Sequence, residues 1–460
     1  MLVDTVIKNC KIVGVDGVVS AGIGVDDGKI VVIAKDQNLP SADKCIDAKG
    51  RFVIPGVIDP HVHYSLYRSY EEDCKSEARA AVAGGITTEA LMTWGGMDKL
   101  LVSYKEKFEE AKSIVERHAL ANVVFISCLF TDQHIREIPE YVRDLGITQF
   151  KHCLFLKGKD AEALGIPSFD DTKLYTALEI ASTLGPPVIS MIHAENVEIH
   201  YGIKERLMKD GRRDLRAWTE AKPSICESEA VNRVISLSDY LDVPIYLVHI
   251  SSSESLDIAV QAQARGSKVI VETCPQYLSL SWKDFPENYV PAKCNPPLRD
   301  EKHIEKLWWG IKNGYVHCIG SDHCASTGKG NLDIWSAPAG LPGLETLLPV
   351  MLSEGVNKGR ISLEKLVEVC CRNPAKVLGI QSQKGAIAVG LDADLVMVDL
   401  NESRRVKVDD LYTASDFTPY EGRELKGWPV LTMVGGNIVM EDGEIVGEPG
   451  VGKYIPRKLL

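Results

Sequence analysis

Two histidines, His61 and His63, stand two positions apart, and Asp59 and Pro60 separate them from the apolar residues Val57 and Ile58. On an extended strand this spacing places both imidazoles on one face, where they could share a metal ion. A pair of packed histidines at a strand end fits the same spacing equally well. The pair alone therefore does not decide between packing and metal binding.

Four further residues with metal-binding or charged side chains stand within or at the ends of other short apolar stretches: Lys151, His193, His249 and Asp322. Each has an ordinary explanation alone, such as a core histidine bonded to a carbonyl or an aspartate that caps a helix. Together they place metal-competent groups on five predicted strands, and this coincidence favours a metal site. Lys151 does not fit as it stands, because an ammonium repels a divalent cation and is costly to bury. A lysine that reaches the rim to bind substrate is its alternative role.

The elements that would position these residues are short apolar runs that alternate with longer amphipathic segments, which is typical of parallel βα units. Eight strands are predicted, at 57–59, 86–91, 122–129, 149–154, 187–193, 244–250, 268–273 and 316–322. Helices are predicted between them, for example at 72–83 and 100–118. This pattern predicts a (β/α)8 TIM-like barrel within an α/β fold, with its site at the C-terminal ends of the strands. A doubly wound open sheet is disfavoured because no GxGxxG follows the first strand.

Both ends of the chain have a different, strand-rich character, with turns at Asp16-Gly17, Asp27-Gly28 and Gly435-Gly436. Strands are predicted at 3–7, 11–13, 23–25 and 29–33, and again at 387–389, 394–398, 429–434 and 437–440. Each end alone is too thin to stand as a sheet with covered edges. We therefore expect residues 1–54 and 381–460 to form one small β-sandwich, with the barrel at 55–380.

Composition excludes several classes of function. The net charge of −12 argues against a nucleic-acid or anionic-membrane partner. No run of about 18 apolar residues predicts a membrane span, and no secretory signal is expected. The 12 cysteines include no CxxC pair, so they are expected to be reduced thiols in a cytoplasmic protein.

The whole chain resembles the cyclic amidohydrolases: hydantoinase, allantoinase, dihydropyrimidinase and, more distantly, dihydroorotase. The motifs that carry the resemblance are the Pro55-Gly56 and Asp59-Pro60-His61-Val62-His63 stretch, Gly84-Gly85-Ile86-Thr87-Thr88, Phe150-Lys151, His193-Ala194-Glu195-Asn196, His249-Ile250-Ser251-Ser252, Asn295-Pro296-Pro297-Leu298-Arg299 and Gly320-Ser321-Asp322-His323. The segments from Gly343 to Arg360 and from Asn373 to Lys376 resemble the L-type hydantoinase and allantoinase branch.

This resemblance implies a binuclear metal hydrolase with a carboxylated Lys151, whose carbamate has one oxygen for each of two divalent ions. One ion would take His61, His63, Lys151 and Asp322, and the other would take Lys151, His193 and His249. A hydroxide that bridges the ions would attack the cyclic amide, with Asp322 as the general base. Imidazole and carboxylate ligands suit zinc, although manganese, iron or cobalt fit similar sites. The resemblance also implies a homotetramer.

The substrate is less well determined by the sequence. Leu156 stands where dihydropyrimidinases and D-selective hydantoinases carry a tyrosine, and Ser65 stands where dihydroorotases carry a carboxylate-binding arginine, although Arg68 is close by. These departures favour a hydantoin-like ring or allantoin over dihydropyrimidinase or dihydroorotase-like activity. Asn295 is a candidate contact to the ring amide. Loops at 131–138 and 325–340 are expected to shape the pocket, with Trp94, Phe155 and Trp335 as candidate lining residues.

Two alternatives of another kind stay open. A non-catalytic assembly protein can share this fold, but such relatives lack part of the ligand set that is complete here. A dipeptidase or deaminase on the same barrel would use the same order of ligands. A serine nucleophile is disfavoured because no GxSxG is present.

Overall fold

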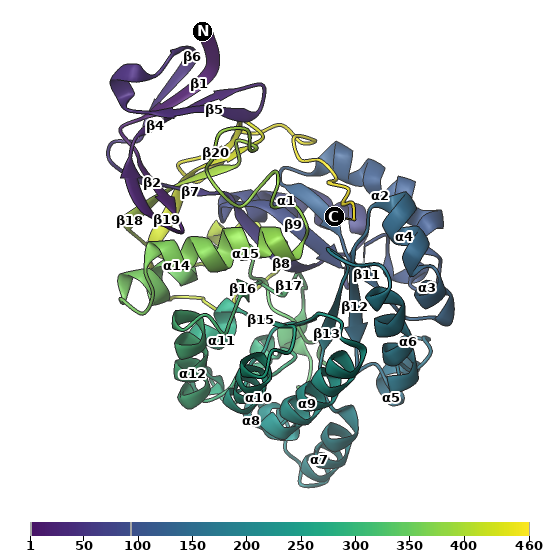
Figure 1. Cartoon of the computed structure of the whole chain (residues 1–460). Coiled ribbons are helices and arrows are strands. Elements are labelled where there is room, and N and C mark those ends of the chain that lie inside the picture. The colour runs from purple at the N-terminus through teal and green to yellow at the C-terminus, as the bar shows by residue number, and fades with distance from the viewer. Residues whose placement is uncertain (1, 93, 460) are drawn as a thin grey trace.

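A computed structural model describes residues 2–92 and 94–459 (Figure 1). Its centre is a ring of short parallel strands: β8 (Val57–His63), β9 (Ile86–Met92), β10 (Asn122–Phe125), β11 (Ser127–Cys128), β12 (Gln149–Cys153), β13 (Ile189–His193), β14 (Ile245–Leu247), β15 (Val269–Thr273), β16 (Cys318–Ile319) and β17 (His323–Cys324). They pair in the orders β10-β9-β8-β17 and β11-β12-β13-β14-β15-β16. Because β10 leads into β11 and β16 leads into β17, the two sheets form one closed ring. The predicted TIM-like barrel is confirmed.

Two predicted strands are interrupted where the ring passes from one sheet to the next. The stretch 122–129 divides at Ile126, whose N–H bonds to the Leu91 carbonyl while Ser127 already pairs with Phe150 on the other side. The stretch 316–322 divides before Asp322, whose N–H donates to the His61 carbonyl at 3.0 Å. Asp322 has a φ of 52°, a left-handed conformation that a regular strand cannot contain.

Helices surround the barrel, as Figure 1 shows. The longer ones are α1 (Tyr70–Ala83), α2 (Tyr104–His118), α4 (Ile138–Leu145), α6 (Asp171–Ser182), α7 (Val197–Lys209), α9 (Ser224–Leu241), α10 (Ser253–Ala264) and α12 (Glu301–Lys312). Shorter ones are α3 (Asp132–Arg136), α5 (Lys159–Ala163), α8 (Leu215–Ala221), α11 (Pro275–Ser279), α13 (Leu347–Val350), α14 (Leu363–Val367) and α15 (Asn373–Val377).

Helix boundaries follow the caps. Helix α1 begins at Tyr70 because Ser69 and Glu72 form a capping box, two residues before the predicted start. Helix α2 begins at Tyr104, later than predicted, because the Ser103 side chain accepts the N–H of Lys105 and ends the preceding loop. The expected loop at 131–138 contains the short helix α3, capped by Thr131.

The two chain ends form a pair of sheets beside the barrel, and Figure 1 shows the purple and yellow-green strands side by side. One sheet has the order β5-β4-β1-β6 and is made from β1 (Leu2–Lys8), β4 (Gly22–Asp26), β5 (Lys29–Ala34) and β6 (Ser41–Asp47). The other has the order β21-β20-β19-β18-β7-β2-β3 and contains β2 (Lys11–Gly14), β3 (Gly17–Ser20), β7 (Phe52–Pro55), β18 (Leu395–Arg405), β19 (Glu424–Val434), β20 (Asn437–Glu441) and β21 (Glu444–Ile445). Strand β18 pairs antiparallel with β7, and buried Ile23, Leu395 and Met433 belong to the shared core. The sandwich of both ends is therefore confirmed.

One predicted strand of the sandwich, 387–389, is wrong. Residues there run as a turn, in which the Gly390 N–H bonds to the Ile30 carbonyl at the edge of β5. Ala388 and Val389 are exposed, so the apolar character of this stretch indicates neither burial nor strand pairing. No helix within residues 2–92 and 94–459 is long and apolar enough to cross a membrane.

Candidate functional site

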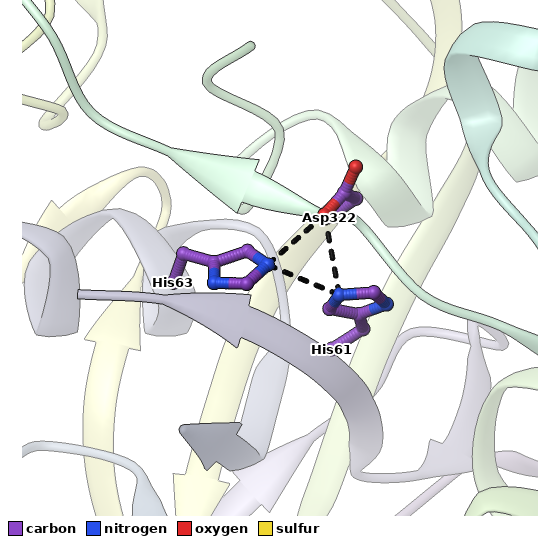
Figure 2. Close-up of side chains that lie close together, drawn as sticks. All are labelled: His61, His63 and Asp322. Atoms are coloured by element: carbon purple, nitrogen blue, oxygen red, sulfur yellow. Dashed lines mark hydrogen bonds and ion pairs between the residues drawn. The ribbon is translucent and has the colours of Figure 1, made fainter. Parts of the chain in front are cut away.

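His61, His63 and Asp322 meet at the end of the first barrel strand (Figure 2). The two histidine Nε2 atoms lie 3.1 Å apart, and Asp322 Oδ1 lies 3.2 Å from His61 Nε2 and 3.3 Å from His63 Nε2. One ligand atom from each of the three side chains can therefore face a single metal ion. Burial opposes the ionisation of Asp322, yet the neighbouring His61 holds the pKa of that carboxyl below its ordinary value.

Lys151, from β12, joins the same cluster. Its Nζ lies 3.0 Å from His61 Nε2, and the residue is 1% exposed. It forms no ion pair with a carboxylate among the residues that the structure describes. A buried ammonium without an anionic partner is costly, so this position favours a group that has lost its positive charge.

His193 ends β13 and His249 follows β14, and both imidazoles are buried beside the cluster. Their ring centroids lie 4.3 Å apart, and the His249 ring lies 5.3 Å from that of His61. Burial lowers the pKa of His193, and it lowers the pKa of His249 well below the ordinary value. Neutral imidazoles are the form that binds metals. The structure thus brings together all six residues predicted to be ligands.

Glu272, which sequence reasoning missed, holds two of these histidines. Its carboxylate accepts from His61 Nδ1 at 2.8 Å, from the His249 backbone N–H at 2.9 Å and from the Tyr246 hydroxyl at 2.7 Å. The bond to His61 favours the tautomer whose Nε2 lone pair points at the cluster. The available signal was a carboxylate within the otherwise apolar strand β15.

Glu195 supports His193 in a similar way. Its Oε2 lies 3.2 Å from His193 Nε2 and accepts a 2.6 Å bond from Lys222 Nζ. All three groups are buried. Lys222 is far from this motif in the sequence, and no spacing rule indicates the pair.

The donor set fits a metal centre. The Nδ1 atoms of His63 and His249 are buried without a hydrogen-bond partner among the described residues. Three close acceptor atoms on His61, His63 and Asp322 would repel one another unless a cation or proton lies between them. Neutral imidazoles and an ionised carboxylate are donors that suit a divalent transition metal.

A cavity of about 430 Å³ opens above the cluster, and its lining includes His63, Lys151, His193, His249 and Asp322. The predicted substrate residues Leu156 and Asn295 line it too, as do Phe155 and Trp335. The Asn295 side-chain oxygen is buried there without a hydrogen-bond partner in the described chain. It is therefore available to a ligand.

Two other candidate contacts lie elsewhere. Trp94 is fully buried outside the cavity lining, and its Nε1 donates to the Ile126 carbonyl. Arg68 lies in a neighbouring surface hollow, where its guanidinium pairs with Asp73 at 2.9 Å and with Glu77 at 3.4 Å. These carboxylates already neutralise the Arg68 guanidinium, which was a candidate to bind a substrate carboxylate.

Comparison with known proteins gives concordant matches. A model described as "Amidohydrolase family" matches residues 192–439. The L-hydantoinase of Paenarthrobacter aurescens is 34% identical over 99% of this chain and 98% of its own length, and the D-hydantoinase of Ralstonia pickettii is 34% identical over 99% of both. The allantoinase of Bacillus licheniformis is 31% identical over 98% of this chain and 99% of its own.

Solved structures agree with the sequence matches. The L-hydantoinase (dihydropyrimidinase) from Arthrobacter aurescens superposes with a TM-score of 0.89 at 32% identity, covering 99% of this chain and 100% of the other. A D-hydantoinase superposes with a TM-score of 0.90 at 32% identity, covering 98% of each chain. Because an L-hydantoinase and D-hydantoinases are equally similar to this chain, overall sequence identity does not determine which enantiomer of a substrate it would prefer.

Proposed function

Because the chain belongs to the amidohydrolase family, with hydantoinases and an allantoinase among its relatives, we propose that it opens a hydantoin-like ring or allantoin. It is a hydrolase of carbon–nitrogen bonds in cyclic amides. The observation that carries the proposal is that six predicted metal ligands lie together and that five of them line one cavity of small-molecule size. The motifs that resemble the cyclic amidohydrolases are spread over the whole barrel, in the order expected for that family.

In this proposal His61, His63, Lys151 and Asp322 hold one divalent ion, and Lys151, His193 and His249 hold the second. Lys151 does so as a carbamate, which removes the buried positive charge described above. When bound, two such ions would polarise the ring carbonyl and lower the pKa of bound water towards neutrality. Zinc is the proposed metal, and a homotetramer is the proposed assembly.

The chain's own residues would then transfer protons and orient the substrate ring. The low pKa of Asp322 keeps its carboxylate ionised at neutral pH, so it can accept the proton of the attacking water. The same group would return that proton to the departing ring nitrogen. Asn295, whose buried side-chain oxygen is free to accept, would take a ring N–H and fix the ring's orientation.

The base role has a direct test in Asp322→Asn. The amide keeps the size of the side chain but cannot accept the proton, so we expect kcat to fall by about 10²–10⁴-fold. Single-turnover and steady-state rates should be measured on protein whose metal content is also determined. Unchanged kcat at full metal content would contradict the assignment.

The function itself is tested by one panel of substrates. Purified protein with measured metal content is assayed on hydantoin, both hands of a 5-substituted hydantoin, allantoin, dihydrouracil and dihydroorotate. Turnover of a hydantoin or allantoin supports the proposal, and turnover of dihydrouracil alone would identify a dihydropyrimidinase instead. No turnover of any ring at two metals per chain would overturn it.

A further inference from the structure

One part of the cavity is lined by lysine and tryptophan side chains that lie close to one another. Lys204, Lys222 and Lys293 line it together with Trp218 and Trp335. They come from helix α7, from helix α8 and the residue after it, from the segment before Asn295 and from the loop that contains Trp335. We call these five residues the lysine–tryptophan end.

Lys293 is the most deeply placed of these cations. The residue is 4% exposed, and its Nζ lies 4.2 Å from the centre of the Trp218 ring. The ammonium donates to the carbonyl of Ala337 and, at 3.5 Å, to that of Trp335. These are neutral acceptors, so the charge of Lys293 has no anionic partner within residues 2–92 and 94–459.

The other lysines do not supply that partner. Lys222 is neutralised by Glu195, with which it forms a 2.6 Å ion pair. Lys204 is partly exposed at 5.8 Å from the Trp335 ring centre and also forms no ion pair with a described carboxylate. The acidic lining residues are Asp160, on α5, and Asp322, which belongs to the metal cluster. Positive charge at this end is therefore in excess.

A second buried lysine bonds to the backbone of Lys293. Lys329 is fully buried, and its Nζ donates to the carbonyls of Lys293 at 2.6 Å, Gly340 at 2.7 Å and Pro291 at 2.9 Å. Its charge adds to that of Lys293, and burial followed by these neighbouring lysines lowers the pKa of Lys293 to about 7. An anion placed in the cavity would reverse this effect and stabilise the ammonium.

We propose that the substrate's ring carries a substituent ending in a carboxylate, and that the Lys293 ammonium binds this carboxylate at the lysine–tryptophan end. This inference rests on the proposed function and narrows its substrate class. Asn295 stands two positions after Lys293 and lines the same cavity, so one segment would contact both the ring and its substituent. The Trp218 ring would cover the apolar part of the substituent, and Lys204 would add long-range attraction at the mouth.

The test compares matched pairs of substrates on the metal-loaded enzyme. Hydantoins with a carboxymethyl or carboxyethyl group at C5 are assayed beside the corresponding carboxamides, which have the same shape without the charge. The wild-type enzyme should prefer the carboxylates by about tenfold or more in kcat/KM. Lys293→Met should remove that preference through a higher KM for the carboxylates, while Lys293→Arg should retain part of it.

Lys306→Met is the matched control. Lys306 also lies over a tryptophan, 3.9 Å from the Trp309 ring centre, but it does not line the cavity. The control should leave the preference unchanged. If Lys293 only holds the Trp335 loop in place, Lys293→Met should lower the turnover of carboxylates and carboxamides equally. That result would overturn the proposal.

The outcome separates this inference from the proposed function. Turnover of hydantoins with no preference for the carboxylate in the wild-type enzyme would reject the carboxylate site and keep the ring-opening activity. Absence of turnover for charged and neutral rings alike would reject both. The wild-type preference needs no variant, so it decides whether the substituent ends in a carboxylate even if Lys293→Met does not fold. Lys293→Arg then tests whether Lys293 is the residue that binds it.

Discussion

The two ends of the cavity are assembled in different ways. At the metal end, His61, Lys151 and His193 lie on barrel strands, and His249 and Asp322 follow strand ends. At the lysine–tryptophan end, the side chains come from helices and connecting segments that meet only after folding. Strand geometry fixes where the first set points, whereas packing between distant segments positions the second. We propose that the first set carries the chemistry and that the second selects the substrate.

The largest expected effect is at the metal end. Lys151→Ala removes the only side chain proposed to bind both ions, so both metals and at least about 10³-fold of activity should be lost. Metal content and turnover of the best ring substrate are the measurements. Partial rescue by a short carboxylic acid is expected because it can occupy the place of the carbamate, and full activity in the variant would refute the bridging role.

A smaller loss of metal affinity or activity is expected at Glu272, which contacts two of the proposed ligands. Glu272→Gln weakens the orientation of His61 and His249 while leaving every proposed ligand in place. Metal affinity or activity should fall by about 10–100-fold, as measured by competition with a chelator. Wild-type affinity in this variant would mean that the histidines are positioned without the carboxylate.

The lysine–tryptophan end should respond through stability as well as through KM. Lys329→Met leaves three buried carbonyls without their donor and should lower the free energy of unfolding by about 3 kcal/mol. The displaced segment should also raise KM for the preferred substrate without removing the bound metal. Denaturant unfolding and metal content measured on one sample test this. Loss of the metal as well would mean that the two ends are not independent.

The smallest effect is expected at Arg68. Its guanidinium pairs with Asp73 and Glu77 outside the cavity, so Arg68→Gln should change KM for every ring by less than about twofold. A modest loss of thermal stability is expected because Glu77 is buried. A large rise in KM for a carboxylate-bearing ring would instead assign the anion site to Arg68.

The barrel and its metal end were accessible from the sequence for a physical reason. Parallel strands place their C-terminal residues on one rim, so His61, His193 and Asp322 could be placed together without coordinates. The resemblance supplied what spacing could not, namely the expected carboxylation of Lys151 and the expected division of ligands between two ions. The domain boundaries at 54 and 380 and the roles of the site residues stay predictions.

What the sequence did not indicate depended on long-range contacts. Glu272 and Lys222 act through partners on other strands or helices, and no local spacing identifies them. Glu195 lies two positions after His193, but its role became visible only through its contacts with His193 and Lys222. Lys293 stood next to a recognised motif, but its burial beneath Trp218 became visible only in the fold. The strand predicted at 387–389 fails for another reason, because Ala388 and Val389 are apolar yet exposed and do not pair with a sheet.

The most direct test of the central claim is a titration of metal-free enzyme with a divalent ion, with bound metal and ring-opening rate followed together. We expect no turnover after chelation and a rate that reaches its maximum at two ions per chain. The same titration of Lys151→Ala should give neither tight binding nor turnover. Full ring-opening activity in metal-free wild-type protein would contradict the account.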